Sequence, residues 1–169
     1  SVIEAASILQ ARPEITFLLI GDGAEREKLE TQIRSRGITN VELLGLQPRE
    51  AMPDWIASVD ILLVCLRDLP VFETVIPSKI FEFLAQERPV ILAARGEIRR
   101  MTELAGAAWV IDPEDPHAMV EAIECIAQQP QESQRRASAG RRWVETEFVR
   151  DSLALRMLAF MKEVAGSQP

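Results

Sequence analysis

The chain has 169 residues, of which 47% are hydrophobic and 27% charged, and its formal net charge at pH 7 is −7. This composition is ordinary for a single globular domain, and the acidic balance argues against non-specific nucleic-acid binding, which needs a basic surface. No run of about 18 apolar residues and no signal peptide is present. We expect residues 1–169 to form one domain, and the absence of an initiating methionine suggests a piece of a longer polypeptide.

Short apolar runs alternate with amphipathic stretches along the whole chain. Five runs rich in apolar and β-branched residues predict strands, at 15–21, 41–46, 61–66, 89–94 and 108–112. Helices are predicted around them, at 1–13, 24–37, 49–59, 78–87, 97–106, 115–129 and 131–164. The last of these has a predicted break near Val149, and Asp115 is the predicted cap of the helix over 115–129.

The strand pattern predicts the fold class. Continuous apolar runs are typical of strands covered by helices on both faces, as in parallel sheets. Strand–helix units repeated five times predict a doubly wound, Rossmann-like α/β fold with a parallel sheet of about five to six strands. Because the helix that opens such a unit normally follows a strand, we expect one strand to precede Ser1.

Residue types that bind metals or form disulfides are scarce. Cys65 and Cys125 lie in apolar surroundings and are interpreted as free core thiols. His117 is the sole histidine and lies at a helix start. The sequence therefore predicts no metal site and no bound cofactor.

The first candidate site is the turn Gly21-Asp22-Gly23, because ligands of such folds bind at the carboxyl ends of the strands. Two interpretations stay open: a tight strand–helix connection, or a turn whose backbone approaches a nucleotide. The dinucleotide fingerprint needs a third glycine at position 26, where Arg26 stands, so NAD binding is disfavoured.

The second candidate site follows the third strand, where the connection over 67–79 is the longest at that edge. It leads into a helix with Ser78 as the predicted cap and with Lys79 and Glu82 on one face. These two residues form either an exposed ion pair or a site for an anion and a pair of hydroxyl groups. The opposite, buried face is predicted to hold Ile80, Phe81, Leu84 and Ala85.

The segments resemble, in the same order, the C-terminal domain of retaining glycosyltransferases of family 4 (group 1), which have the two-domain GT-B fold. The most specific piece is "PSKIFEFLAQERPVILAARGEIRRM" (77–101). The other pieces are "TFLLIGDGAEREKLE", "NVELLGLQPREAMPDWIASVDILLVCL" and "AWVIDPEDPHAMVEAI". The likeness covers nearly the whole chain and is similar to enzymes of bacterial surface-polysaccharide biosynthesis.

The resemblance implies binding of a nucleotide diphosphate sugar, with residue roles carried over by position. Glu82 would hold the ribose, the Gly21–Gly23 turn would lie beside the donor, and Gln47 would lie near the base. The backbone around Pro77, Ser78 and Lys79 would face the diphosphate or the sugar. The family often has two glutamates separated by seven residues; eight residues separate Glu73 from Glu82, and Glu73 is the candidate for the sugar-contacting, catalytic role.

The resemblance also implies partners. An N-terminal acceptor-binding domain would complete the enzyme, so this chain would not transfer sugar alone, because catalysis needs both reactants held together. A cytoplasmic location is expected, with peripheral contact to the inner membrane face through the missing half. The alternative function is a non-catalytic Rossmann-type nucleotide-binding or scaffolding module.

Overall fold

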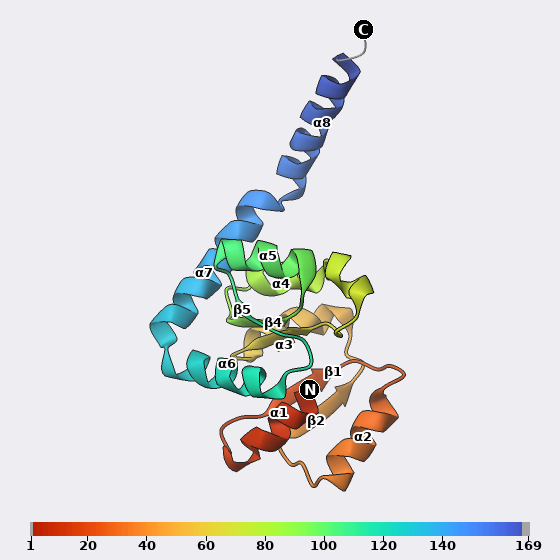
Figure 1. Ribbon diagram of the computed structural model, residues 1–169, viewed down its shortest axis with the longest axis vertical. Helices are drawn as coiled ribbons and strands as arrows, with labels where there is room; N and C mark the ends of the chain where they lie inside the picture. The colour runs from red at the N-terminus through yellow and green to blue at the C-terminus, as the bar shows by residue number, and fades with distance from the viewer. Residues whose placement is uncertain (1, 167–169) are drawn as a thin grey trace.

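The computed structural model describes residues 2–166 and shows an α/β arrangement of strands between helices (Figure 1). The strands are β1 (Phe17–Ile20), β2 (Val41–Gly45), β3 (Leu62–Cys65), β4 (Val90–Ala93) and β5 (Trp109–Ile111). The α-helices are α1 (Val2–Ile8), α2 (Arg26–Ser35), α3 (Met52–Ser58), α4 (Lys79–Ala85), α5 (Gly96–Ala105), α6 (Pro116–Gln128), α7 (Pro130–Glu147) and α8 (Arg150–Gly166). Short 3-10 helices are η1 (Leu9–Ala11), η2 (Arg49–Ala51) and η3 (Pro70–Thr74). Each predicted strand contains one observed strand, so the predicted α/β class is confirmed.

All strand pairs are parallel, as predicted, but the sheet is divided. β1 pairs with β2, and β3, β4 and β5 form a second sheet in that order. Within residues 2–166 no ladder joins the β1–β2 sheet to the β3–β4–β5 sheet. The expected sheet of five to six strands is thus present as two parts, of two and three strands.

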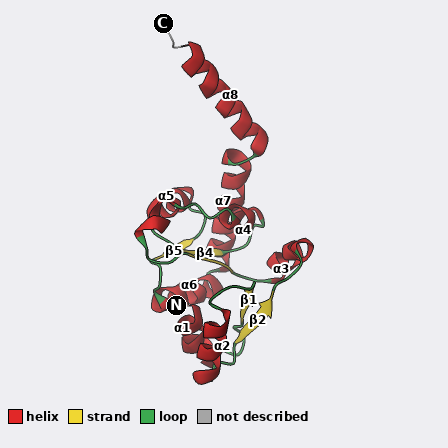
Figure 2. Ribbon diagram, turned by 90° about the vertical axis from the view of Figure 1, so that its right-hand side faces the viewer, coloured by secondary structure: helices red, strands yellow, loops and turns green. Residues whose placement is uncertain are grey.

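Strand β4 lies at the centre of the larger sheet and is buried on both faces. Val90 and Leu92 belong to the core that contains Ile80 and Leu84 of α4, whereas Ile91 belongs to the core on the other face. Figures 1 and 2 show α4 and α5 on one side of β4 and β5, and α1 and α6 on the other. The helices therefore cover both faces, which is the doubly wound arrangement.

Helix α7 packs closely on α4. Gly140 of α7 permits this, since a Cβ atom there would lie 2.7 Å from Cδ2 of Leu84. The ring of Phe81 of α4 lies tilted against that of Phe148, with 4.3 Å between the ring centroids, and Phe148 also meets Trp143 edge-on at 5.0 Å. These contacts fix α4, the helix that begins at the second candidate site.

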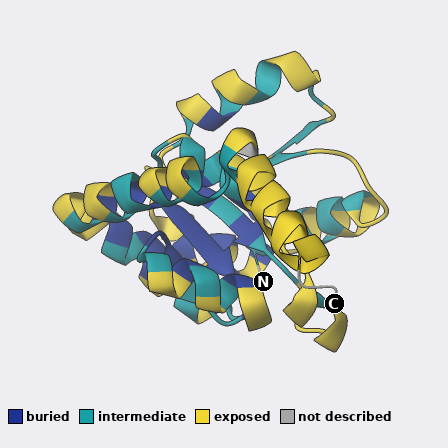
Figure 3. Cartoon of the chain, turned by 90° about the horizontal axis from the view of Figure 1, so that it is seen from above, coloured by how far each residue is buried: buried dark blue, intermediate teal, exposed yellow. Residues whose placement is uncertain are grey.

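The predicted break near Val149 is confirmed, since it separates α7 from α8. α8 extends away from the body of the molecule, and it is exposed along its length (Figures 1 and 3). Among the residues from 2 to 166, no helix is long and apolar enough to cross a membrane.

Glu132 and Arg136 connect α7 to β5. Arg136 donates to Glu132 at 2.7 Å and to the carbonyl of Ala108 at 2.9 Å, and its guanidinium lies 4.7 Å from the ring centre of the buried Trp109. Arg135 donates to the same carboxylate at 2.6 Å. Hydrogen bonds from Arg135 and Arg136 lower the pKa of Glu132 from 4.5 to about 2.

We predict that Glu132→Gln lowers the melting temperature at pH 7 and that this difference disappears in acid. Because the pKa of Glu132 is lower in the folded than in the unfolded protein, its stabilisation is complete above about pH 4.5 and is lost as the pH falls toward about 2. Thermal unfolding from pH 2 to 7 measures this, with Glu121→Gln on the exposed face of α6 as the control. A deficit that did not change with pH would mean that the carboxylate charge is not the cause.

Candidate functional site

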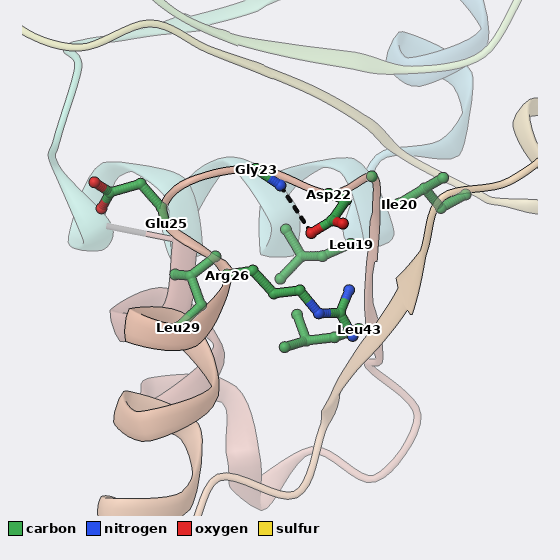
Figure 4. A pocket seen from close by; sticks show the side chains of 9 residues that line it. Leu19, Ile20, Asp22, Gly23, Glu25, Arg26, Leu29 and Leu43 are labelled. Atoms are coloured by element: carbon green, nitrogen blue, oxygen red, sulfur yellow. Dashed lines mark hydrogen bonds between the residues drawn. The ribbon is translucent and has the colours of Figure 1, made fainter.

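The turn after β1 is held by its own backbone and by one side chain. The amide of Gly21 donates to the carbonyl of Gly45 at 2.8 Å, which joins the ends of β1 and β2. The amide of Gly23 donates to Asp22 Oδ1 at 3.0 Å (Figure 4). Gly21 has a φ of 133°, a conformation that side chains disfavour. The three predicted residues are exposed together at the carboxyl end of β1.

This turn borders a hollow of about 230 Å³, whose other lining residues include Arg26, Leu29 and Leu43. Figure 4 shows the Arg26 side chain reaching from α2 toward Leu43 of β2. Its guanidinium pairs with Glu30 at 2.9 Å. A long cationic side chain thus stands where the dinucleotide fingerprint requires a glycine.

A second hollow, of about 430 Å³, is lined by residues from both parts of the divided sheet. Leu19 of β1 and Glu25 contribute from one part, and Cys65 and Arg67 from the end of β3. Hydrogen bonding and charge from Lys28 lower the pKa of Glu25, and the charge of Arg67 acts in the same direction. The start of α2 and the connection after β3 therefore face each other across this hollow.

Ser78 lies at the predicted cap position, but its side chain does not cap α4. Its φ of −57° and ψ of −31° are already helical, and its hydroxyl makes no capping hydrogen bond. A capping side chain needs an extended backbone to reach the amides of the first turn, so this prediction is wrong. The amides of Ile80 and Phe81 bond instead to the carbonyls of Pro77 and Ser78, both at 3.1 Å.

Lys79 and Glu82 are exposed, and within residues 2–166 they form no ion pair with each other. The interpretation of Lys79 and Glu82 as an exposed ion pair is therefore wrong. Burial raises the pKa of the Cys65 thiol, and the charge of Lys79 opposes this shift. Because Cys65 is the last residue of β3, the Lys79 ammonium lies near the carboxyl end of that strand.

Glu73 is exposed in η3, and its backbone rests on the first residue of α5. A Cβ atom on Gly96 would lie 2.0 Å from the carbonyl oxygen of Glu73, so the two segments touch. Glu73 and Glu82 belong to separate helices, η3 and α4, which are joined by residues 75–78.

The sequence analysis missed Arg95, which links the ends of three strands. Its guanidinium donates to Asp68, after β3, at 3.0 and 3.4 Å, and pairs with Asp112, after β5, at 3.4 Å. Arg99 holds the other oxygen of Asp112 at 2.5 Å. The sequence did contain a signal for this link. Arg95 follows the predicted strand at 89–94, and an aspartate follows or ends each of the predicted strands before and after it, at Asp68 and Asp112.

The remaining predicted residues lie at the same edge in less open positions. Gln47 turns its amide back to the carbonyl of Leu44 at 2.8 Å, and Pro77 is half-buried before α4. Cys65 and Cys125 are free thiols, as interpreted from the sequence. Among residues 2–166 there is no cluster of three or more His, Cys, Asp or Glu side chains that could hold a metal ion.

We predict that Lys79→Met slows alkylation of Cys65 by iodoacetamide. Loss of the ammonium removes an effect that lowers the pKa of the thiol, so less thiolate is present at a given pH. Rates measured from pH 7 to 10 in a Cys125→Ser background report Cys65 alone, and Lys162→Met on the exposed helix α8 is the matched control. An unchanged rate profile in Lys79→Met would contradict the placement of Lys79 beside β3.

Comparison with known proteins agrees with the resemblance to group 1 glycosyltransferases that the sequence shows. The family model described as glycosyl transferases group 1 matches residues 1–129. A relative, WcaI of Escherichia coli (strain K12), a glycosyl transferase assigned by name to colanic acid biosynthesis, is 31% identical over 126 residues, which are 73% of this chain and 30% of WcaI.

Two solved structures share the fold over nearly all of the chain. A glycosyltransferase from Rickettsia africae ESF-5 superposes with a TM-score of 0.80 at 17% identity, covering 99% of this chain and 44% of that one. Anabaena Alr3699/HepE in complex with UDP-glucose superposes with a TM-score of 0.78 at 19% identity, covering 95% of this chain and 44% of that one. This chain thus spans less than half the length of these proteins, and it has the fold of the C-terminal domain of a GT-B glycosyltransferase. The chain belongs to the glycosyl transferases group 1 family.

Proposed function

We propose that this chain is the donor-binding domain of a glycosyltransferase that moves a sugar from a nucleotide diphosphate to a hydroxyl acceptor. The observation that carries the proposal is the exposure of Lys79 and Glu82, which are not paired with each other within residues 2–166, with the Lys79 ammonium close enough to the end of β3 to act on Cys65. Family membership and the UDP-glucose in a structure of the same fold support the choice of ligand.

Each side chain at this edge has a chemical task in the proposal. The Lys79 ammonium faces the diphosphate, whose charge it balances, and the Glu82 carboxylate accepts hydrogen bonds from a pair of ribose hydroxyls. α4 has only seven residues, so its dipole is short and the lysine charge is the larger attraction. The backbone N–H groups of Ser78 and Lys79, which follow Pro77, lie beside the same phosphates.

The remaining edge residues surround the donor. The exposed turn Gly21-Asp22-Gly23 lies against the nucleotide, since two glycines let its backbone approach closely. Gln47 lies near the base.

In the proposed reaction Glu73 contacts the donor sugar as the catalytic carboxylate, with retention of configuration. Catalysis consists mainly of positioning the two substrates and of stabilising the charge that develops on the leaving diphosphate. The donor is a substrate, and the proposal needs no resident cofactor.

We propose that the acceptor is bound by a second, N-terminal domain, and that this chain alone does not transfer sugar. The lengths of the relatives support this proposal, since the chain spans 30% of WcaI and 44% of the HepE chain. The expected location is the cytoplasm, with contact to the inner membrane face made by the other domain. The name of WcaI supports a role in bacterial polysaccharide biosynthesis.

The divided sheet supports a further part of this proposal: one strand that precedes α1 in the complete enzyme lies between β1 and β3. The two strands are unpaired with each other in the described part of the chain, and the hollow of about 430 Å³ is lined by Leu19 of β1, Cys65 of β3 and Val2 and Ile3 of α1. A parallel strand placed there would join the two sheets into one of six strands.

We predict that calorimetry detects UDP binding to the chain and that Glu82→Gln weakens it about tenfold or more. The estimate is the loss of a hydrogen bond to a charged group, about 1.5–3 kcal/mol. Glu121→Gln on α6 is the control and should bind as the wild type does. If UDP and GDP both fail to bind at millimolar concentration, the proposal is wrong. Binding without transfer or hydrolysis by the complete protein would favour the non-catalytic module.

We predict that the complete polypeptide protects the amides of β1 and β3 from hydrogen exchange more strongly than this chain does. A strand between them would provide new ladder hydrogen bonds to both edges. Mass-spectrometric exchange measures the effect, with β5, on the far edge of the larger sheet, as the internal control. Equal protection of β1 and β3 in both proteins would exclude the intervening strand.

A further inference from the structure

Segment η3, which carries Glu73, is only weakly anchored by burial, since Phe72 is half-buried and its other four residues are exposed. None of its five residues is buried, and its backbone hydrogen bonds outside the helix, from Phe72 to Leu69 and from Val75 to Phe72, are local. Something other than burial must therefore fix the position of Glu73 relative to the strand ends.

Gly96 provides a direct contact. It is the first residue of α5 and has a φ of 73°, and a Cβ atom there would lie 2.0 Å from the carbonyl oxygen and 2.5 Å from the carbonyl carbon and Cα of Glu73. The Glu73 backbone occupies the space that any other residue at position 96 would fill. The glycine thus has a packing role that conformational freedom alone does not explain.

Arg95 holds the same connection at its other end. It grips Asp68 at 3.0 and 3.4 Å, two residues before η3 begins, and it is held in turn by Asp112 at 3.4 Å. The pKa of Arg95 is raised, chiefly by the hydrogen bond to Asp68 and the charge of Asp112, and the charge of Glu73 adds to the shift. The Glu73 carboxylate is therefore close enough to Arg95 to interact with it electrostatically.

We propose that Arg95 and Gly96 are positioning residues that hold η3 so that Glu73 meets the sugar part of the donor. The inference rests on the proposed function and deepens it: these two residues set recognition of the sugar, whereas Lys79 and Glu82 bind the nucleotide part. Neither Arg95 nor Gly96 needs to touch the donor, because each acts through the placement of Glu73.

The test compares Gly96→Ala with Gly106→Ala. Both glycines lie at ends of α5 and have positive φ, 73° and 58°, so alanine strains either position. Only Gly96 contacts Glu73; the nearest side chain to a Cβ on Gly106 is Arg135, at 3.9 Å. Arg95→Gln is the milder second variant, which removes the grip on Asp68 without a clash.

Two measurements are made on each variant. Hydrogen exchange over residues 68–76 is expected to accelerate in Gly96→Ala and Arg95→Gln and to stay unchanged in Gly106→Ala. Calorimetry on the wild type first identifies which of UDP-glucose, UDP-N-acetylglucosamine and GDP-mannose binds most tightly. The affinity for that sugar donor and for its free nucleotide diphosphate is then measured in each variant. Gly96→Ala and Arg95→Gln are expected to lose about tenfold in affinity for the sugar donor relative to its free nucleotide diphosphate, the scale of one charge-assisted hydrogen bond.

Each outcome has a distinct meaning. If exchange over 68–76 is unchanged, or if the ratio of the two affinities is the same in the variants and the wild type, the positioning role is wrong while the donor site stands. A general loss of stability would weaken both ligands equally and so would count against the proposal. If the wild type binds no nucleotide, the proposed function itself fails.

Discussion

The arrangement of the candidate site depends on the burial of β4 between two layers of helices. Its four residues are all buried, with Val90 and Leu92 facing the core of α4 and Ile91 facing the core of α6. Burial of each such side chain contributes roughly 1.5–3 kcal/mol. Because β4 pairs in parallel with β3 and β5, this burial fixes the carboxyl ends of three strands at one edge. The connections after β3 and β4, which carry Glu73, Arg95 and Gly96 and lead to Lys79, therefore begin from rigid positions.

Charges at this edge are divided between structural and free groups. Arg95 forms ion pairs with Asp68 and Asp112, and Arg99 pairs with Asp112, and these contacts join the ends of the strands. Lys79 is exposed and takes part in none of these pairs. Because no salt bridge of Lys79 is present within residues 2–166, its ammonium can meet an anionic ligand without breaking an ion pair in that part of the chain. The same edge thus contains one set of charges that ties the strand ends together and, in the proposed function, another that recognises the donor.

Two close contacts of glycine help to place α4 and η3. Gly140 lets α7 approach Leu84 of α4, and Gly96 lets the backbone of Glu73 rest on α5. In both places the missing Cβ atom shortens the separation between two segments, which larger residues would force apart. The position of α4 is further held by the aromatic contact of Phe81 with Phe148. The position of the candidate site therefore depends on how α7 packs on α4 and how η3 packs on α5, as well as on the loops that carry its residues.

The sequence by itself determined the local elements, because hydrophobic periodicity and caps are properties of neighbouring residues. The apolar run containing β4 and the cap of α6, where Asp115 accepts from the amide of Ala118 at 2.9 Å, were both predictable. Ser78 failed as a cap because its backbone angles depend on how the preceding connection reaches α4. Only the tertiary structure decided that the strands form two sheets, that Arg95 bridges Asp68 and Asp112, and that Gly96 supports Glu73. These contacts join residues far apart in the chain, and their geometry follows from the packing of whole helices and strands, which no local pattern encodes.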